Sequence, residues 1–513
     1  MLAWVGTLAI TVLALFLQLW RLGQPRALMF DETYYAKDAW SLLHFGYAQN
    51  YVDGANDEII AGHTTGLWNG TPEMVVHPEI GKWLIALGEQ AFGMTPFGWR
   101  VSSAVVGALM VLVMIRLARR VTRSTLLGLV AGLLMTFDGL HFVLSRLALL
   151  DIFVGFFVLC AVSCMVADRD WGREKLARLV PDGTRLGAAA WGPMLWWRPW
   201  RLATGVCWGL AVSTKWTALF PLAAFGLLMW VWDAGARHSF GVRRALVKSA
   251  IIDAAPALVY VVLLPLVIYV ASWAGWLMHA GVYEQALSDT QYGPYWGNYL
   301  ARDASGFFPE LAQSLRSLWH YHHDVYSFHT GFLNDSTHVY QSDPWGWLVL
   351  NRPVGVDAQT NIAPGEQGCA AAAGSTCLRQ VLLLGNPVVW WFGTIAAVWA
   401  VLVWIGKRDW RYGVVVVGVA STWLPWLRFD DRPIFSYYAI VILPFVILGA
   451  VMLLGEILGP VGATARRRST GALVAGSVVV LAMASFAFFW PIYTDQLLTN
   501  SEWLSRMWFK RWI

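Results

Sequence analysis

An acidic pair directly after the first apolar run is the strongest candidate for chemistry. Asp31 and Glu32 follow the apolar residues 2–20 and stand among aromatic residues in Met29-Phe30-Asp31-Glu32-Thr33-Tyr34-Tyr35. A carboxylate at a membrane surface can accept a proton from an attacking hydroxyl, which is general-base catalysis. The same pair also fits the start of a helix, with Asp31 as the N-cap. The two interpretations are compatible.

Cations recur beside the outer ends of later apolar runs. Arg100 is a candidate phosphate ligand, because an arginine at the membrane is costly unless an anion pairs with it. Arg432, shortly before Tyr437, suits a phosphate headgroup, and a self-neutralising Arg/Asp turn is the alternative. His77 and Lys82 form a further polar island, for which a turn with the Lys82 side chain reaching lipid headgroups is the alternative.

Three more ionisable residues lie near the outer turns. Arg146 and Asp151 could contribute to a site, or they could pair with each other and close a helical hairpin. Lys215 is expected below the outer surface, where it needs an anionic partner. That partner would be either a carboxylate or a phosphate of a ligand.

A second polar region lies in residues 275–380. His320 and His323 have i, i+3 spacing without a metal-site pattern, which favours an amphipathic surface helix and no metal. Gln341, Trp345 and Trp347 could contact a sugar or peptide, or lie in an interfacial aromatic belt. Cys369 and Cys377 are close enough in sequence to form a disulfide that closes a loop.

The elements that must position these residues are membrane helices. The 513 residues are 57% hydrophobic and only 13% charged, with a mean hydropathy of +0.52, which excludes an ordinary soluble protein. Apolar runs predict eleven spans, at 2–20, 97–116, 124–142, 147–166, 202–213, 216–233, 250–274, 381–405, 412–427, 434–454 and 471–490.

Basic residues concentrate in five short connectors, which the positive-inside rule places in the cytoplasm. The N-terminus is then inside and the C-terminus outside. Residues 201–232 have basic flanks at both ends, so we expect two short helices that turn at 213–215. This topology leaves two long external segments, 21–96 and 275–380, and long loops of that kind usually carry function. The net charge of +5 therefore does not indicate a nucleic-acid partner.

These motifs, in this order and on this side of the membrane, resemble the protein O-mannosyltransferases of the GT-C glycosyltransferase class. The resemblance covers essentially the whole chain and rests on these motifs: Phe30-Asp31-Glu32, His77-Pro78 with Gly81-Lys82, Arg100, Ser145-Arg146 with Leu149-Leu150-Asp151, Ser213-Thr214-Lys215-Trp216, Ser342-Asp343-Pro344-Trp345-Gly346-Trp347 and Arg432 to Tyr438. It implies an all-α polytopic fold of about eleven helices in one membrane domain, 1–513. The segment 275–380 is too short for the MIR domain of eukaryotic members, which indicates a bacterial type.

The resemblance implies inverting transfer of mannose from polyprenyl-phosphate-mannose to Ser/Thr hydroxyls of exported proteins. Asp31 would be the general base, and Glu32 would position it or contact the sugar or acceptor. The donor site would draw on His77, Lys82, Arg100, Arg146, Asp151, Lys215, Arg432 and Tyr437, and the acceptor would meet Gln341, Trp345 and Trp347. No cofactor is implied, and a divalent cation stays open.

The implied location is the plasma membrane, with the active site on the extracytoplasmic face. Partners would be the donor lipid, exported polypeptides, membrane lipids and the protein-export machinery. Two alternatives stay open. A sibling GT-C enzyme would act on a lipid or glycan acceptor, although the WWDYG motif of oligosaccharyltransferases is absent. A transporter or flippase would place ionisable residues near the bilayer midplane instead of at one surface.

Overall fold

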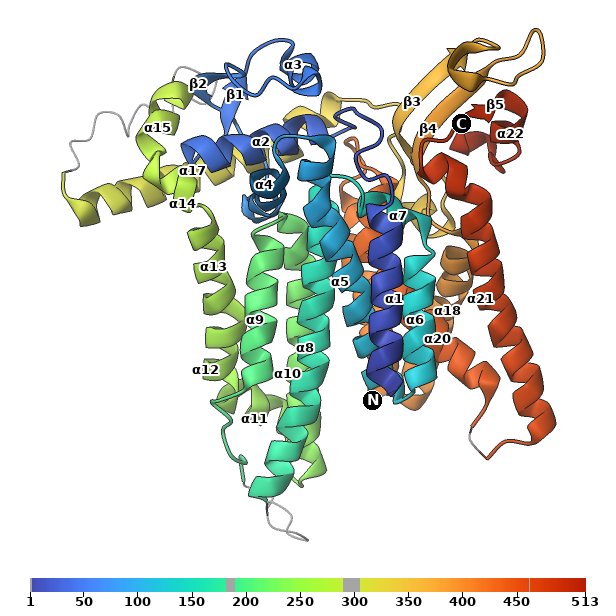
Figure 1. Ribbon diagram of the computed structural model, residues 1–513. Helices are drawn as coiled ribbons and strands as arrows, with labels where there is room; N and C mark the ends of the chain where they lie inside the picture. The colour runs from blue at the N-terminus through green and yellow to red at the C-terminus, as the bar shows by residue number, and fades with distance from the viewer. Residues whose placement is uncertain (1, 181–189, 289–304, 461) are drawn as a thin grey trace.

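Long apolar helices stand side by side and form the body of the protein (Figure 1). The computed structural model describes residues 2–180, 190–288, 305–460 and 462–513. Within those ranges, six helices have the length and composition to cross a membrane: α5 (Pro96–Thr122), α8 (Leu150–Leu179), α10 with the 3-10 turn before it (Trp216–Ser239), α13 with the helical residues before it (Ala254–Ser272), α18 (Pro387–Lys407) and α21 (Ala465–Tyr493).

The remaining expected spans are also helical, but they are shorter. They are α1 (Leu2–Leu19), α6 (Thr125–Thr136), α9 (Pro199–Val212), α19 (Trp410–Trp423) and α20 (Leu443–Leu458). At 1.5 Å per residue, the 14 residues of α9 reach only about 21 Å, which is less than the roughly 30 Å of a hydrocarbon core. Figure 1 places the two termini at opposite ends of the bundle, as an odd number of crossings requires. The count of eleven crossings and the sidedness stay predictions.

Shorter elements form a layer across one end of the bundle (Figure 1). Its helices are α2 (Glu32–Phe45), α3 (Ala55–Ala61), α4 (Ile80–Phe92), α7 (Gly139–Leu144), α14 (Ala274–Met278), α15 (Ala280–Ser288), α17 (Phe307–Thr330) and α22 (Asn500–Leu504). Most of the two long segments predicted to be external lies in this layer. Residues 289–304 of the second segment are outside the described residues.

Two small antiparallel sheets in the same layer were not predicted. In the first, β1 (Gln49–Tyr51) pairs with β2 (Trp68–Pro72). In the second, β4 (Cys377–Leu383) lies between β3 (Val354–Ile362) and β5 (Leu498–Thr499). The chain assigned to a span from residue 381 onward therefore begins as the end of β4, and α18 starts only at Pro387.

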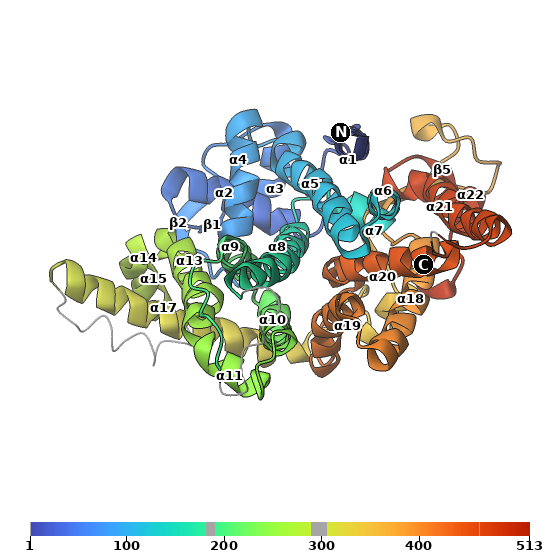
Figure 2. The same ribbon diagram turned by 90° about the horizontal axis from the view of Figure 1, so that it is seen from below.

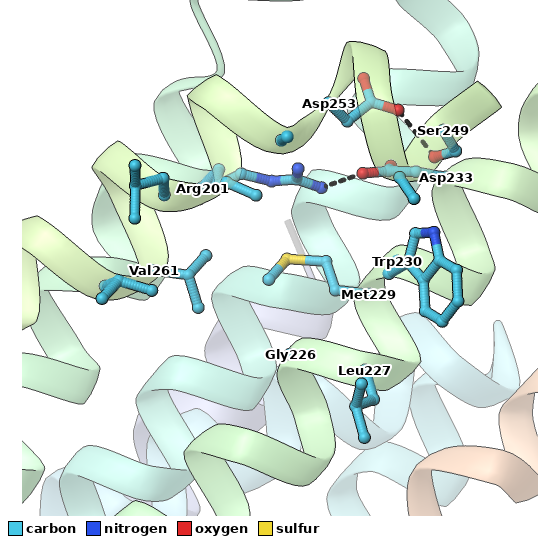
Figure 3. A pocket seen from close by; sticks show the side chains of 14 residues that line it. Arg201, Gly226, Leu227, Met229, Trp230, Asp233, Ser249, Asp253 and Val261 are labelled. Atoms are coloured by element: carbon cyan, nitrogen blue, oxygen red, sulfur yellow. Dashed lines mark hydrogen bonds and ion pairs between the residues drawn. The ribbon is translucent and has the colours of Figure 1, made fainter. Parts of the chain in front are cut away.

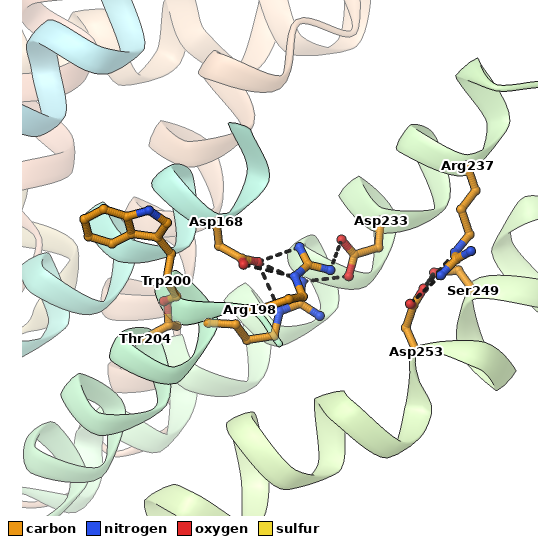
Figure 4. Close-up of polar contacts among 9 residues, drawn as sticks. Asp168, Arg198, Trp200, Thr204, Asp233, Arg237, Ser249 and Asp253 are labelled. Atoms are coloured by element: carbon orange, nitrogen blue, oxygen red, sulfur yellow. Dashed lines mark hydrogen bonds and ion pairs between the residues drawn. The ribbon is translucent and has the colours of Figure 1, made fainter. Parts of the chain in front are cut away.

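Buried ion pairs connect α8, α9 and α10 at the end of the bundle away from the layer of short elements (Figure 4). Asp168 on α8 accepts hydrogen bonds from Arg198 and Arg201 at 2.6–3.1 Å. The same two arginines donate to Asp233 on α10 at 3.0 and 2.7 Å. Nearby, Arg237 pairs with Asp253 at 2.6 Å. In each cluster the number of carboxylates equals the number of arginines, and this charge balance lets the arginines lie buried.

A mostly apolar cavity of about 390 Å³ adjoins these pairs (Figure 3). Met229 and Val261 contribute to its apolar lining, and Arg201 and Asp233 lie at its polar side. Because those two charges already bind each other, the cavity offers no uncompensated charge from that pair to a ligand. It lies at the end of the bundle opposite the layer of short elements.

We expect Asp168→Asn to lower the free energy of unfolding by about 3–5 kcal/mol, the usual cost of breaking a buried ion pair, because two buried arginines lose a carboxylate. Asp170→Asn, on the same helix, is the control. Asp170 forms only half-exposed pairs with Arg120 and Arg169, so the loss should stay below about 1 kcal/mol. Denaturation of both variants in detergent checks this, and equal losses would contradict it.

Candidate active site

Asp31 stands at the first turn of α2, in the layer above the helix bundle. It occupies the N-cap position of α2, but its side chain makes no capping hydrogen bond. The preceding residue, Phe30, has a left-handed backbone with φ of 51°, and its ring packs against Phe435 and Tyr437. A fixed turn therefore positions the Asp31 carboxylate, which makes no hydrogen bond to the helix N-terminus.

Glu32 is the anchor of this turn. Both of its carboxylate oxygens accept hydrogen bonds from Arg100 at 2.8 Å, and both side chains are fully buried. Glu32 also accepts the backbone N–H groups of Met29 at 2.9 Å and Ala148 at 3.0 Å. The predicted positioning role agrees with this geometry, whereas contact with a sugar or acceptor does not, since the carboxylate is enclosed by protein donors.

Arg100 has different partners from the phosphate that we expected. Besides its two bonds to Glu32, it donates to the carbonyl oxygens of Leu22, Pro25 and Ala27 at 2.7–3.3 Å. These five hydrogen bonds match the five N–H groups of a guanidinium. Arg100 therefore fixes the chain between α1 and α2, and no donor is left for a ligand.

Asp31 lies in a partly buried, mixed-charge environment. Its Oδ2 is 3.5 Å from the hydroxyl of Tyr437. Burial raises the pKa of Asp31 to about 6; Lys215 and the Tyr437 hydroxyl oppose this shift, and Asp151 adds to it. A carboxyl group with this pKa is a proton acceptor at neutral pH and is more basic than an exposed aspartate. Sequence position alone did not predict this shift.

Lys215 forms an ion pair with Asp151. Its Nζ is 3.0 Å from both carboxylate oxygens and lies 4.4 Å from the centre of the Tyr438 ring. Of the two partners expected for Lys215, the carboxylate is the one present, so the Arg146–Asp151 pair does not form. Gly81 at the start of α4 lets α4 pack closely against Leu150, the residue before Asp151, since a Cβ at position 81 would lie 2.6 Å from the Leu150 side chain.

Arg432 reaches the same region from the loop before Tyr437. Its Nη1 donates to Nδ1 of His329 at 2.7 Å, and its buried Nε has no acceptor among the described residues. The His329 ring stacks on that of His77, 5.6 Å away. Burial and Arg432 lower the pKa of His329 to about 4, so the ring is neutral and Nδ1 accepts.

His329 was missed as a site residue by sequence reasoning. It lies in the last turn of α17, and no motif distinguishes it from the neighbouring histidines of that helix. Burial, together with nearby Lys215, also lowers the pKa of His77. The two stacked rings are therefore neutral, and His329 is hydrogen-bonded to Arg432.

Two other predicted donor-site cations lie elsewhere. Arg146 donates to the carbonyl oxygens of Gln18 at 2.9 Å and Trp20 at 2.6 Å, so it caps the C-terminal end of α1. Lys82 pairs with Asp38 of α2 at 2.7 Å, and both side chains are buried. It does not extend to lipid headgroups. Arg146 thus connects to the bundle helix α1, and Lys82 joins α4 to α2 within the layer of short elements.

The aromatic motif of the second segment divides into a buried and an exposed part. Trp347 is 1% exposed, donates to Ser342 at 2.8 Å and packs against the Tyr438 ring, so it supports the site from behind. Trp345 is 65% exposed, and Gln341 is half-buried. Of these residues, Trp345 is the one most open to an acceptor.

Two other predictions concern the same segment. Cys369 and Cys377 form a disulfide with Cα atoms 5.7 Å apart, next to β4. Within the described ranges, no group of three or more His, Cys, Asp and Glu side chains could hold a metal ion. His322 instead hydrogen-bonds with Tyr269 and stacks on Trp216.

An apolar groove begins beside the charged cluster. Asp151 and Tyr438 line a narrow cavity that Phe220 and Ser421 also line. The same Phe220 and Ser421 border a larger, almost wholly apolar groove of about 900 Å³ between α10 and α19. The groove therefore lies next to a cavity that is lined by Asp151, the ion-pair partner of Lys215.

Family models match nearly all of this architecture. Residues 8–280 match the model described as dolichyl-phosphate-mannose-protein mannosyltransferase, and residues 314–512 match the C-terminal four TMM region of protein-O-mannosyltransferase. The chain belongs to the protein O-mannosyltransferase family. It is therefore a glycosyltransferase, and the family predicted from the motifs is confirmed.

Individual relatives agree with this assignment. The chain is 36% identical to a polyprenol-phosphate-mannose–protein mannosyltransferase of Mycolicibacterium smegmatis, over 99% of this chain and 93% of the relative. It is 32% identical to the enzyme of that name from Corynebacterium glutamicum, over 94% and 88%. The S. cerevisiae protein O-mannosyltransferase Pmt1–Pmt2 complex bound to the sugar donor has a similar fold, with a TM-score of 0.70 at 15% identity, over 100% of this chain and 93% of that chain. The predicted GT-C fold class is confirmed.

Proposed function

We propose that this mannosyltransferase transfers mannose from a polyprenyl phosphate to Ser or Thr hydroxyls of exported polypeptides, on the outer face of the membrane and with inversion at the anomeric carbon. The observation that carries the proposal is the position of Asp31. A partly exposed carboxylate with a pKa raised to about 6 lies beside Lys215, whose partner Asp151 lines a narrow cavity next to a large apolar groove.

The donor lipid fits the groove between α10 and α19. Its prenyl chain would lie against apolar side chains, and its phosphate would lie near Arg432 and Lys215. Arg432 is the stronger ligand, because its Nε has no acceptor among the described residues, whereas Lys215 already binds Asp151. Cations near the leaving phosphate stabilise the charge that develops on it.

The reaction then needs one carboxylate. The acceptor oxygen attacks the anomeric carbon while the bond from that carbon to the phosphate oxygen breaks. The hydroxyl proton passes to Asp31, and polyprenyl phosphate leaves with the electron pair. Since a phosphate leaves without being protonated, a general acid is not required. Glu32 and Arg100 act by holding the turn that aims Asp31.

A defined acceptor tests the proposal. Purified enzyme in lipid nanodiscs is incubated with radiolabelled polyprenyl-phosphate-mannose and a peptide that contains a single Thr. We expect label in the peptide, none in the Thr→Val peptide, and release of the label by alkaline β-elimination. Label that enters lipid or glycan acceptors in place of the peptide would favour the sibling GT-C function.

The raised pKa of Asp31 predicts the pH dependence. A base must be deprotonated, so kcat/KM for the peptide should rise with pH and level off above about 6. In Asp31→Asn the residual activity should lack this limb, since the group that titrates is gone. Rates measured between pH 5 and 8 decide this. An unchanged limb in Asp31→Asn would assign the titration to another group.

A further inference from the structure

β3 presents a free strand edge beside the catalytic turn. The second sheet has the order β3-β4-β5, so β3 pairs on one side only, and no second strand among the described residues covers its other edge. Ala358, Gln359, Thr360 and Asn361 are exposed, whereas residues 354–356 are buried. A free edge offers a row of N–H and C=O groups that can pair with another extended chain.

The composition of β3 does little to block such pairing. Native edge strands are often protected by Lys or Pro, and Val354–Ile362 contains neither. Its register with β4 is regular at Asp357, Ala358 and Gln359, with shifts on either side of this run. The exposed side chains that follow Asp357 are small or uncharged, so an added strand would meet no bulky side chain or like charge there.

A series of side-chain contacts connects the N-terminal end of β3 with Phe30, the residue before Asp31. Gly355 packs so closely on Tyr340 that an added Cβ would lie 2.6 Å from the phenol oxygen. The Tyr340 ring is 6.0 Å from that of His338, which is 5.8 Å from the ring of Phe30. Phe30 immediately precedes Asp31. Figure 1 shows β3 on the side of its sheet toward α2, with β4 and β5 beyond it.

We propose that the acceptor polypeptide docks in extended form along the free edge of β3, as an added strand that delivers its hydroxyl residue to Asp31. This inference rests on the proposed function, because it identifies where the second substrate binds. Backbone pairing is independent of side chains, so the edge would accept acceptors of varied sequence. The four exposed residues 358–361 present about 14 Å of edge at 3.4 Å per residue.

Alternate backbone methylation of the acceptor tests the docking. In an antiparallel or parallel edge pair, every second residue of the peptide directs its N–H toward β3. Two isomeric Thr peptides are compared with the unmethylated peptide: one is N-methylated at two odd-numbered positions and the other at two even-numbered positions. One isomer should raise KM about 5- to 150-fold, as expected for two lost hydrogen bonds, and the other should stay within about twofold. Equal effects of the two isomers would overturn the proposal.

Disulfide trapping locates the peptide on this chain. Cys160, Cys164 and Cys207 are first replaced by Ala, and Gln359→Cys is compared with Ser501→Cys, an exposed position on α22 at the far side of the sheet. A Cys-bearing peptide should be trapped at position 359 and not at 501. Equal trapping, or a disulfide between two copies of the Gln359→Cys enzyme in place of peptide capture, would contradict acceptor docking.

The two proposals fail separately. If the unmodified enzyme transfers no mannose to the unmethylated peptide, the proposed function is wrong. If transfer proceeds normally but methylation parity and position 359 have no effect, only the docking edge is wrong. Gln359→Cys should elute as a single species and unfold at the same temperature as the cysteine-replaced parent, which excludes misfolding as the cause of a negative result.

Discussion

Asp31→Asn should fold normally and lower turnover by about 10²–10⁴, the range for loss of a general base. Asparagine is nearly isosteric, and the turn that it occupies is fixed mainly by the Glu32–Arg100 pair and not by the Asp31 side chain. The amide can still lie beside Tyr437, but it cannot accept the proton of the acceptor hydroxyl. Initial rates of mannose transfer at saturating donor give the effect.

Two controls make the Asp31 result specific. Asp53→Asn changes an exposed aspartate in the same layer of short elements and should leave turnover within about twofold. Donor affinity of Asp31→Asn should stay close to that of the parent, because Asp31 acts on the acceptor. Turnover within threefold of the parent in folded Asp31→Asn would remove Asp31 from the mechanism.

Arg432→Gln should weaken donor binding about 10- to 150-fold. A hydrogen bond to a charged group contributes roughly 1.5–3 kcal/mol, and Gln lacks the charge and most of the donors of Arg. The guanidinium is held at the site by His329, and its Nε has no acceptor among the described residues, so a phosphate would complete its hydrogen bonding. Equilibrium binding of labelled polyprenyl-phosphate-mannose measures the loss.

Arg428→Gln is the matched control for Arg432. It changes an exposed arginine in the same turn and should alter donor affinity by less than about twofold. A substitution at Arg100 would not serve this purpose, since all its hydrogen bonds go to Glu32 and the chain before α2. Unchanged donor affinity in Arg432→Gln would place the phosphate elsewhere.

The helices could be predicted because their signal is local. Each apolar run can satisfy its backbone hydrogen bonds within a helix, and each of the eleven predicted segments contains a helix. The strands carry a weaker signal, and β3 and β5 reach their sheet only through long-range pairing with β4. Neither the sheet nor the late start of α18 could be read from hydropathy.

The site could be predicted only as a set of residue types. The motifs identified Asp31, Lys215 and Arg432, but their partners depend on contacts between distant parts of the chain. Arg100 and Glu32 are 68 residues apart, and Arg432 and His329 are 103 apart. Packing decides which cation has all its hydrogen bonds within the protein and which has donors left for a ligand. The spacing of residues in the sequence does not show this packing.

The anomeric configuration of the product tests the central claim most directly. With one base and no covalent intermediate, the acceptor oxygen must attack opposite the departing phosphate. Mannose labelled with ¹³C is transferred to the single-Thr peptide, and the one-bond carbon–proton coupling at the anomeric carbon is compared between donor and glycopeptide. We predict the opposite configuration in the product. Retention would contradict a single displacement with Asp31 as the base.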